Sequence, residues 1–166
     1  MSTVGAILSN TTLSLANDVN DSFAIRKTAD QTVTDATLVS DSHLTLSLAV
    51  TSAYYFSFQL FTTNSGAAEG LQLCVNGTVG VSSLKAQISI SDDLLNTLVG
   101  FGRITAFASA VGAALSSGSN FSVISGVIET STAGTFLLQF AQNAVGLGAG
   151  VTVQKNSSLT LRKLDA

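Results

Sequence analysis

The side chains that could carry out chemistry in this sequence are few and lie far apart. His43 is the only histidine, so a Ser-His-Asp triad or a histidine metal site would have to use it. It opens an alternating segment and faces away from its leucine side, which favours a structural or surface role. Asp92 and Asp93 could form half of a carboxylate site, but adjacent acids more often cap a helix or turn. Only Glu69 and Glu129 join the aspartates, which is a small supply for general acid–base catalysis.

Cysteine and glycine provide no further candidate for catalysis or cofactor binding. The single cysteine, Cys74, excludes an intramolecular disulfide and a cysteine zinc site. It alternates with Leu73 and Val75, which predicts a semi-buried strand position, and no basic neighbour in the sequence would activate its thiol. The glycine-rich run 146–150 lacks the G-x-G-x-x-G spacing, which favours a flexible loop between two strands. We therefore expect no catalytic residues, no metal, no cofactor and no enzymatic activity.

The composition favours a protein that associates through an uncharged surface. With 166 residues, the chain has the length of one domain with a sizeable core. Only 10% of its residues are charged, against roughly a quarter in a typical soluble domain. Hydroxyl and amide groups take their place, and they cost less to desolvate than ions. Such a surface suits packing against copies of the chain or another protein, although a stable secreted scaffold fits as well.

The charge pattern gives no sign of a nucleic-acid or membrane partner. The net charge is −3, and the seven basic residues are scattered rather than aligned in a stripe that could follow phosphates. The weakly charged stretch 104–115 is too short to span a bilayer. The first residues lack the positive region of a secretory signal. We expect a soluble protein that is made without a cleaved export signal.

Alternation with a period of two dominates the sequence from Ser22 onward and predicts many short strands. Turn-forming sequences such as 64–66, 76–77, 116–120 and 156–158 separate them. Short strands at this spacing predict an all-β sandwich or barrel. The expected core faces are Leu44, Leu46, Leu48 and Val50; Tyr54, Phe56, Phe58 and Leu60; Leu71, Leu73 and Val75; Ala86, Ile88 and Ile90; Phe136, Leu138 and Phe140; and Leu159 and Leu161.

Two regions do not follow this alternation. Residues 92–115 carry apolar side chains close to helical spacing, but Gly100 and Gly102 argue against one continuous helix. We expect a short helix or turn near Asp92-Asp93 and then a strand from about Gly102. Residues 1–21 are polar and weakly patterned. They form a candidate docking arm, although packing onto their own sheet is an alternative.

Two stretches of the sequence resemble a known family. The opening stretch contains K-x-x-D-x-T at Lys27, Asp30 and Thr32. The closing stretch contains Gly134, Thr135, Gln139, Ala141 and Gln142, followed by Ser157, Leu159, Leu161 and Leu164. This order, over about residues 22–164, resembles the jelly-roll virion proteins of tailed bacteriophages, whose fold is similar to that of the TNF and C1q group. The sequence departs from that pattern at Phe140, where tryptophan is usual; an aromatic core residue is kept, but an indole donor is absent.

The resemblance implies a fold, an oligomer and a role. It implies a single jelly-roll β-sandwich of TNF/C1q type over residues 22–166, with an extended N-terminal arm over residues 1–21. It also implies a homotrimer that serves as a capsid decoration (cement) protein, a head fibre or a tail-fibre tip. A decoration protein would be made in the host bacterial cytoplasm and would reside on the capsid surface, with itself and the major capsid protein as its partners.

Apolar residues on outward-facing positions are the candidate contact sites. Opposite the core face of Phe136, Leu138 and Phe140, the same strand presents Leu137, Gln139 and Ala141. Tyr55 and Phe61 give the segment 54–63 a similar second face. We expect these faces to meet around a three-fold axis. The candidate capsid-docking residues of the arm are Val4, Ile7, Leu8, Leu13 and Leu15.

Two binding functions remain open, and size favours the first of them. A decoration protein needs a compact body and arms, whereas a tail fibre usually has a long shaft, and this chain contains neither a long repeat nor coiled-coil heptads. A receptor-binding tip that recognises host glycans is the alternative, but the sequence has no tryptophan for stacking on sugars. A polysaccharide depolymerase would need more acidic residues. We therefore expect binding and lattice stabilisation.

Overall fold

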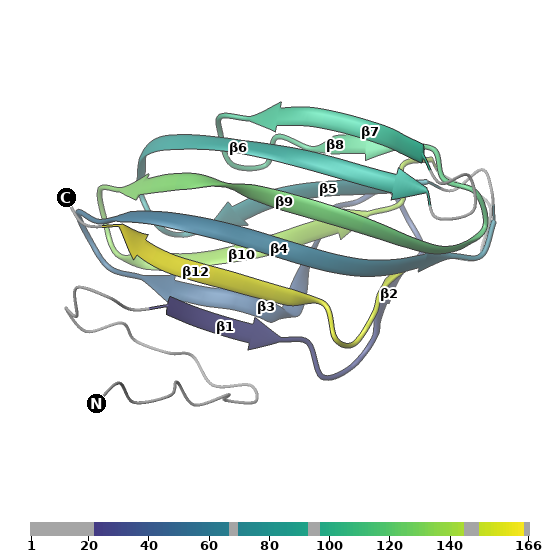
Figure 1. The fold of residues 1–166 in the computed structure, drawn as a ribbon, viewed down its shortest axis with the longest axis horizontal. Helices are drawn as coiled ribbons and strands as arrows, with labels where there is room; N and C mark the ends of the chain where they lie inside the picture. Colours follow the sequence, from purple (N-terminus) through teal and green to yellow (C-terminus); the bar gives the residue numbers. More distant parts are fainter. Residues whose placement is uncertain (1–21, 67–69, 93–96, 145–149, 165–166) are drawn as a thin grey trace.

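The computed structural model describes residues 22–66, 70–92, 97–144 and 150–164, and every regular element among them is a β-strand. The twelve strands, drawn in chain order in Figure 1, are β1 (Ser22–Arg26), β2 (Gln31–Val33), β3 (Val39–Leu48), β4 (Ala53–Asn64), β5 (Leu71–Gly77), β6 (Val81–Asp92), β7 (Thr97–Ile104), β8 (Val111–Ala113), β9 (Gly118–Thr130), β10 (Gly134–Ala141), β11 (Val151–Val153) and β12 (Ser158–Leu164). All recorded strand pairs are antiparallel.

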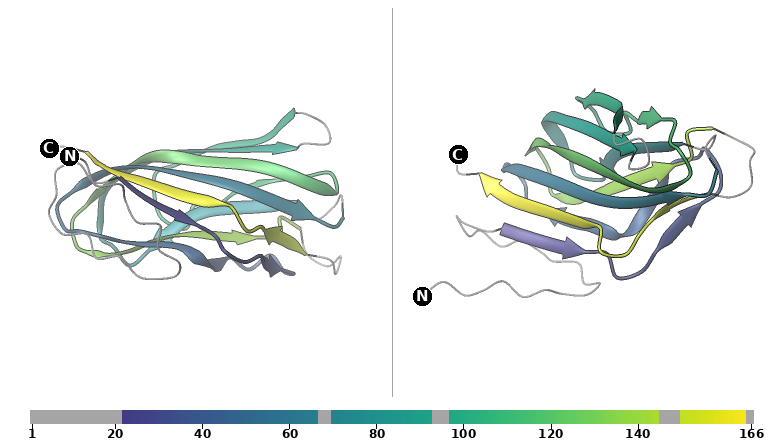
Figure 2. Two further views of the ribbon diagram at one scale, coloured as in Figure 1. Left: turned by 60° about the horizontal axis from the view of Figure 1, so that its bottom comes forward. Right: turned by 45° about the vertical axis from the view of Figure 1, so that its right-hand side comes forward.

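The strand order is that of a jelly roll. One sheet contains the path β1-β12-β4-β9-β6-β7, and the other has the order β3-β10-β5-β8. If the short strands β2 and β11 and the hairpin β6–β7 are set aside, eight strands remain. In chain order these are β1, β3, β4, β5, β8, β9, β10 and β12. The first sheet then holds the first, eighth, third and sixth of them (β1, β12, β4 and β9), and the second sheet holds the second, seventh, fourth and fifth (β3, β10, β5 and β8). This arrangement of two interleaved antiparallel sheets confirms the predicted fold class, and Figures 1 and 2 show the two layers.

The hairpin β6–β7 enlarges the first sheet. It lies in the sequence between β5 and β8, which are neighbours in the second sheet, and it adds two strands beside β9 in the first. On the other side of β4, the short strand β11 pairs with both β4 and β2. The first sheet therefore has eight strands against four in the second, and it presents the wider outward face.

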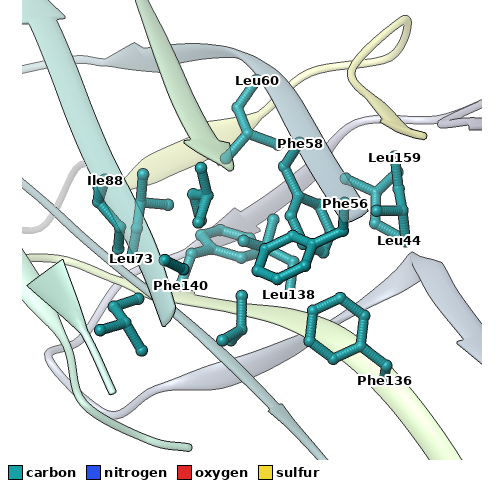
Figure 3. Close-up of a cluster of buried hydrophobic side chains, with 14 of the residues drawn as sticks. Leu44, Phe56, Phe58, Leu60, Leu73, Ile88, Phe136, Leu138, Phe140 and Leu159 are labelled. Carbon is teal, nitrogen blue, oxygen red and sulfur yellow. The ribbon is translucent and has the colours of Figure 1, made fainter. Parts of the chain in front are cut away.

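The core lies between the two sheets, where the alternating side chains of both layers meet (Figure 3). The predicted core faces are buried with a single exception, Val50, which is 53% exposed. That expectation was wrong because β3 ends at Leu48 and the chain then turns, with Thr51 in the left-handed region at a φ of 50°. Alternation holds only while the backbone stays extended, so it does not determine where Val50 points.

The region 92–115 differs from its prediction. Asp92 ends strand β6, and the short helix or turn predicted near Asp92-Asp93 falls on residues 93–96, outside the described part of the chain. The strand predicted from about Gly102 begins earlier, because β7 starts at Thr97, five residues before Gly102. Gly100 and Gly102 lie inside this strand because β8 packs directly against it. A Cβ at Gly102 would lie 2.4 Å from a methyl carbon of Val111, and one at Gly100 would lie 2.8 Å from the Cβ of Ala113. The two glycines therefore permit close packing here and do not interrupt the strand.

Several predictions concern residues outside the described part of the chain. They include the N-terminal arm over residues 1–21, with its candidate docking residues Val4, Ile7, Leu8, Leu13 and Leu15, together with Glu69, Asp93 and most of the glycine-rich run 146–150. The division of the chain at residue 21 and the docking role of the arm stay predictions.

Candidate interface on the eight-stranded sheet

The outward face of the eight-stranded sheet carries a row of large apolar side chains at one end. Strand pairing aligns Phe61 of β4 with Phe121 of β9, Phe121 with Ser91 of β6, and Ser91 with Leu98 of β7. Because paired residues share a face of the sheet, all four side chains point outward, opposite to the core residue Leu60. The rings of Phe61 and Phe121 are 5.4 Å apart between centroids.

A second row lies beside the first and completes an apolar patch. Val123 of β9 is aligned with Gln59 of β4 and with Ser89 of β6, and Ser89 is aligned with Phe101 of β7. Phe101 and Leu98 are 58% and 56% exposed, and Phe61 is 45% exposed. We use the term aromatic patch for the set Phe61, Leu98, Phe101, Phe121 and Val123. Phe121 and Val123 are half-buried, and Ser89 and Ser91 of β6 separate them from Phe101 and Leu98. Exposed apolar side chains gathered on one face are typical of a protein–protein contact site.

The other end of the same face is hollowed and positively charged. A shallow depression of about 530 Å³ is lined by Tyr55, Lys85, Gln87, Arg103, Ser125 and Val127, among others. Tyr55 is aligned with Val127 on one side and with Arg162 of β12 on the other, so a third cation borders the depression. None of the described residues that line it is acidic. One face thus combines an apolar end with a cationic end, and the latter suits an acidic partner surface.

The structure separates the predicted interface residues. Tyr55 and Phe61 lie on the outward face just described, whereas Leu137 and Gln139 lie on β10, which faces outward from the opposite sheet. Ala141 is fully buried and offers no contact surface. The residue that follows it, Gln142, donates a backbone hydrogen bond to the carbonyl of Asp35, so the chain is held against the segment 34–38 directly after β10.

Gln139 makes its polar contacts within the subunit. Its Oε1 atom accepts a hydrogen bond of 2.9 Å from Nδ2 of Asn76, and its Nε2 atom donates to Oγ of Ser40 at 3.2 Å. The side chain therefore links β10 to β5 on one side and to the β3 strand on the other. Sequence alternation placed Gln139 on the correct face but could not show these partners.

Cys74 lies under this amide. Its Sγ atom is 3.7 Å from Oε1 of Gln139, and the residue is fully buried, more so than the sequence predicted. Desolvation by burial raises the pKa of the Cys74 thiol from 9.0 to about 11. The thiol is therefore protonated and inert at neutral pH, as a structural cysteine is.

A buried polar cluster joins the two sheets near β1 and β3. Nζ of Lys27 lies 2.6 Å from Oδ2 of Asp41, and both side chains are 0% exposed. His43, for which the sequence predicted a structural or surface role, is half-buried, with Nδ1 3.3 Å from the Lys27 ammonium. Sequence reasoning missed Lys27 and Asp41 because charged residues are usually exposed. One feature of the sequence could have indicated Lys27: it lies two residues after the buried Ile25, and in an extended strand such residues point to the same face.

Within the described ranges, no group of three or more histidine, cysteine, aspartate or glutamate side chains is placed to hold a metal ion. The same part of the chain contains no helix of the length and hydrophobicity needed to cross a membrane.

Comparison with known proteins shows likeness in fold rather than in sequence. No protein-family model matches the sequence, and no curated protein does. Among solved structures, the chain is similar to the T13 viral particle of IBDV, with 13% identity and a TM-score of 0.48 over 87% of this chain, spanning 31% of that protein's length. It is also similar to Eiger TNF from S. frugiperda, with 10% identity and a TM-score of 0.44, covering 89% of this chain and 94% of that one. A third is a CocE/NonD family hydrolase from Staphylococcus aureus, with 8% identity and a TM-score of 0.39, covering 87% of this chain and 37% of the hydrolase.

Proposed function

We propose that this protein is a capsid decoration (cement) protein of a tailed bacteriophage, which binds the assembled head as a homotrimer and stabilises its lattice. The observation that carries the proposal is the aromatic patch on the wide outward face of the jelly roll. The sequence resemblance to phage virion jelly-roll proteins supports it as well. The role is one of binding, and we propose that no catalysis accompanies it.

The patch can form the apolar centre of a subunit contact. It extends across β4, β9, β6 and β7, and neighbouring strands in a sheet lie about 4.8 Å apart. A standard interface buries about 800 Å² on each partner and has an apolar centre with a polar rim. The aromatic patch supplies such a centre, and Gln59, Ser89 and Ser91 provide polar neighbours without charge.

A trimer around a three-fold axis needs two different surfaces on each subunit, because each subunit contacts one neighbour on each side. The aromatic patch is one such surface. Leu137 on the opposite sheet is a candidate for the second, since it is half-buried and points outward. The separation of Tyr55 and Phe61 from Leu137 is therefore compatible with a ring of three, in which unlike faces meet.

Stabilisation of the capsid would follow from mass action. A protein that binds only the assembled lattice favours that lattice by the free energy of binding. We propose that residues 1–21 provide the contact with the major capsid protein, through Val4, Ile7, Leu8, Leu13 and Leu15. The trimeric body would then remain on the outer surface of the head.

Localisation on intact particles, combined with the molar mass of the purified protein, tests the proposal. We expect cryo-electron microscopy to show density over the head, with three copies at each attachment point, and light scattering to give the mass of a trimer. A monomer both in solution and on the particle would overturn the trimer, and absence from the head would overturn the decoration role.

A receptor-binding tip is the second candidate, and the cationic depression favours it. Tyr55 could stack on a sugar ring while Lys85 and Arg103 bind an acidic substituent. In that case, antibody-gold labelling would be confined to a fibre or to the tail. Binding to acidic oligosaccharides on a glycan array would then distinguish this role from lattice stabilisation.

A further inference from the structure

The buried pair Lys27 and Asp41 joins the two layers of the sandwich. Lys27 directly follows β1 of the eight-stranded sheet, and Asp41 lies on β3 of the four-stranded sheet. The backbone of Lys27 is fixed by two hydrogen bonds, from its amide to the carbonyl of Ser157 and from the amide of Asn156 to its own carbonyl. The side chain thus reaches Asp41 from a rigid position and is shielded from solvent.

The two oxygens of Asp41 have different environments. Oδ2 contacts Nζ of Lys27 at 2.6 Å. Oδ1 accepts two backbone hydrogen bonds of 2.9 Å, one from the amide of His43 and one from the amide of Leu44. Two N–H donors on one carbonyl oxygen form the arrangement that stabilises the negative charge of a tetrahedral intermediate.

A group that could carry a proton lies beside the amine. Nδ1 of His43 is 3.3 Å from Nζ of Lys27, and the same nitrogen is 2.9 Å from the hydroxyl oxygen of Ser42. The site therefore contains an amine, a carboxyl group with one polarised oxygen, and an imidazole in contact with the amine.

We propose that Lys27 and Asp41 condense into an intramolecular isopeptide bond. The ammonium first passes one proton to Oδ2, which gives a neutral amine and a carboxylic acid. Nζ then attacks Cγ, and the negative charge develops on Oδ1 under the two backbone amides. His43 takes one proton from the nitrogen and delivers it to Oδ2. The Cγ–Oδ2 bond breaks, one water molecule leaves, Oδ1 remains as the amide oxygen, and His43 returns to its starting state.

Burial favours this reaction in two ways. Exclusion of water opposes hydrolysis of the amide once it has formed. The surroundings hold both groups in contact, which replaces a bimolecular encounter by a step within one fixed arrangement.

The test is the mass of the complete chain under denaturing conditions, in which an ion pair would not survive. We expect the wild-type protein to be lighter than its sequence by one water molecule. Trypsin should fail to cleave after Lys27, so residues 27–85 should appear as one peptide that is also lighter by one water molecule. A full-length mass without this deficit would overturn the proposal, whatever the function of the protein.

Matched variants locate the bond. K27R keeps a positive charge beside Asp41 but removes the nucleophilic amine, so we expect it to show the full sequence mass. A water deficit that persists in this variant would place the dehydration elsewhere in the chain and overturn the assignment. H43A keeps both reacting groups, and we expect it to contain a fraction of uncondensed chains. Complete condensation in H43A would overturn the role of His43 as the proton carrier.

Discussion

Phe56 of β4 and Phe136 of β10 meet edge to face across the sandwich, with ring centroids 4.9 Å apart and ring planes at 65°. The two rings come from opposite sheets. The rings of Phe58 and Phe107 also lie near the ring of Phe136. Edge-to-face pairs add a specific geometry to the apolar burial of both rings. The centre of the fold therefore depends on Phe136, whose ring lies near two rings of β4 and one ring of the connection between β7 and β8.

Replacing this ring should destabilise the fold strongly. For Phe136→Ala we expect a loss of about 3–5 kcal/mol in the free energy of unfolding, because a fully buried ring leaves a cavity. Guanidinium unfolding monitored by circular dichroism measures it. The control is Val50→Ala, at a position that is 53% exposed, where we expect a change within about 0.5 kcal/mol. Equal losses in the two variants would contradict the central position of Phe136.

A methyl group at Gly126 should separate two paired strands. A Cβ there would lie 2.3 Å from the carbonyl oxygen of Lys85 and 2.5 Å from Cα of Ala86, both backbone atoms of β6. We expect Gly126→Ala to lower the free energy of unfolding by about 1–3 kcal/mol or more, since the backbone must shift. Thermal unfolding checks this result. Ser125→Ala, at the neighbouring position with its side chain on the other face, should leave the midpoint nearly unchanged.

Charge in the aromatic patch should dissociate the oligomer while the subunit stays folded. We expect Phe101→Asp to shift the molar mass from trimer to monomer. Burying an unpaired carboxylate at the subunit contact costs far more free energy than one apolar side chain contributes there. Light scattering gives the mass, and circular dichroism confirms the fold. Val50→Asp is the matched control, since it introduces the same charge at an exposed apolar residue away from the patch. A trimer that tolerates Phe101→Asp would show that the patch is not the subunit contact.

The Cys74 thiol should resist alkylation until the protein unfolds. Its pKa is raised to about 11 by burial, so at pH 8 both the thiolate and access to it are suppressed. We expect no iodoacetamide adduct in the native protein and complete labelling in guanidinium. The unfolded thiol loses its proton near pH 9 and the folded one near pH 11. The contribution of the protonated thiol to the free energy of unfolding therefore falls as the pH rises from about 9 to about 11. Cys74→Ala should remove this dependence, and rapid native labelling at pH 8 would contradict the burial.

The sequence was informative wherever one strand face alone had to be buried. In β4 and β10 the apolar residues alternate without a break, so a shift of one residue would expose all of them, and the core faces follow directly. The near-helical spacing over residues 92–115 misled the prediction. It combines parts of β7 and β8, and the pairing of β7 with β6 is irregular there: Gly100 is aligned with Ile90 and Leu98 with Ser91, which leaves Val99 as an extra residue.

The remaining features depend on contacts between distant parts of the chain. Lys27 and Asp41 are paired across two sheets, and the residue after Ala141 is hydrogen-bonded to Asp35. Neither relationship leaves a local pattern in the sequence. Tyr55 and Phe61 were placed on an outward face correctly, but Leu98 and Phe101 joined them only through the added hairpin, whose position beside β9 no periodicity encodes.

The close contact between β7 and β8 through Gly100 and Gly102 has a consequence for how copies of the chain can associate. Here the edge strand of one sheet lies against the edge strand of the other, and at the opposite side Lys27 and Asp41 hold the segments of β1 and β3 together. Exchange of an edge strand between copies would first have to break these contacts between the layers. Association by strand exchange is thereby opposed, and contacts between copies are left to side-chain surfaces, whose geometry can close after a finite number of subunits.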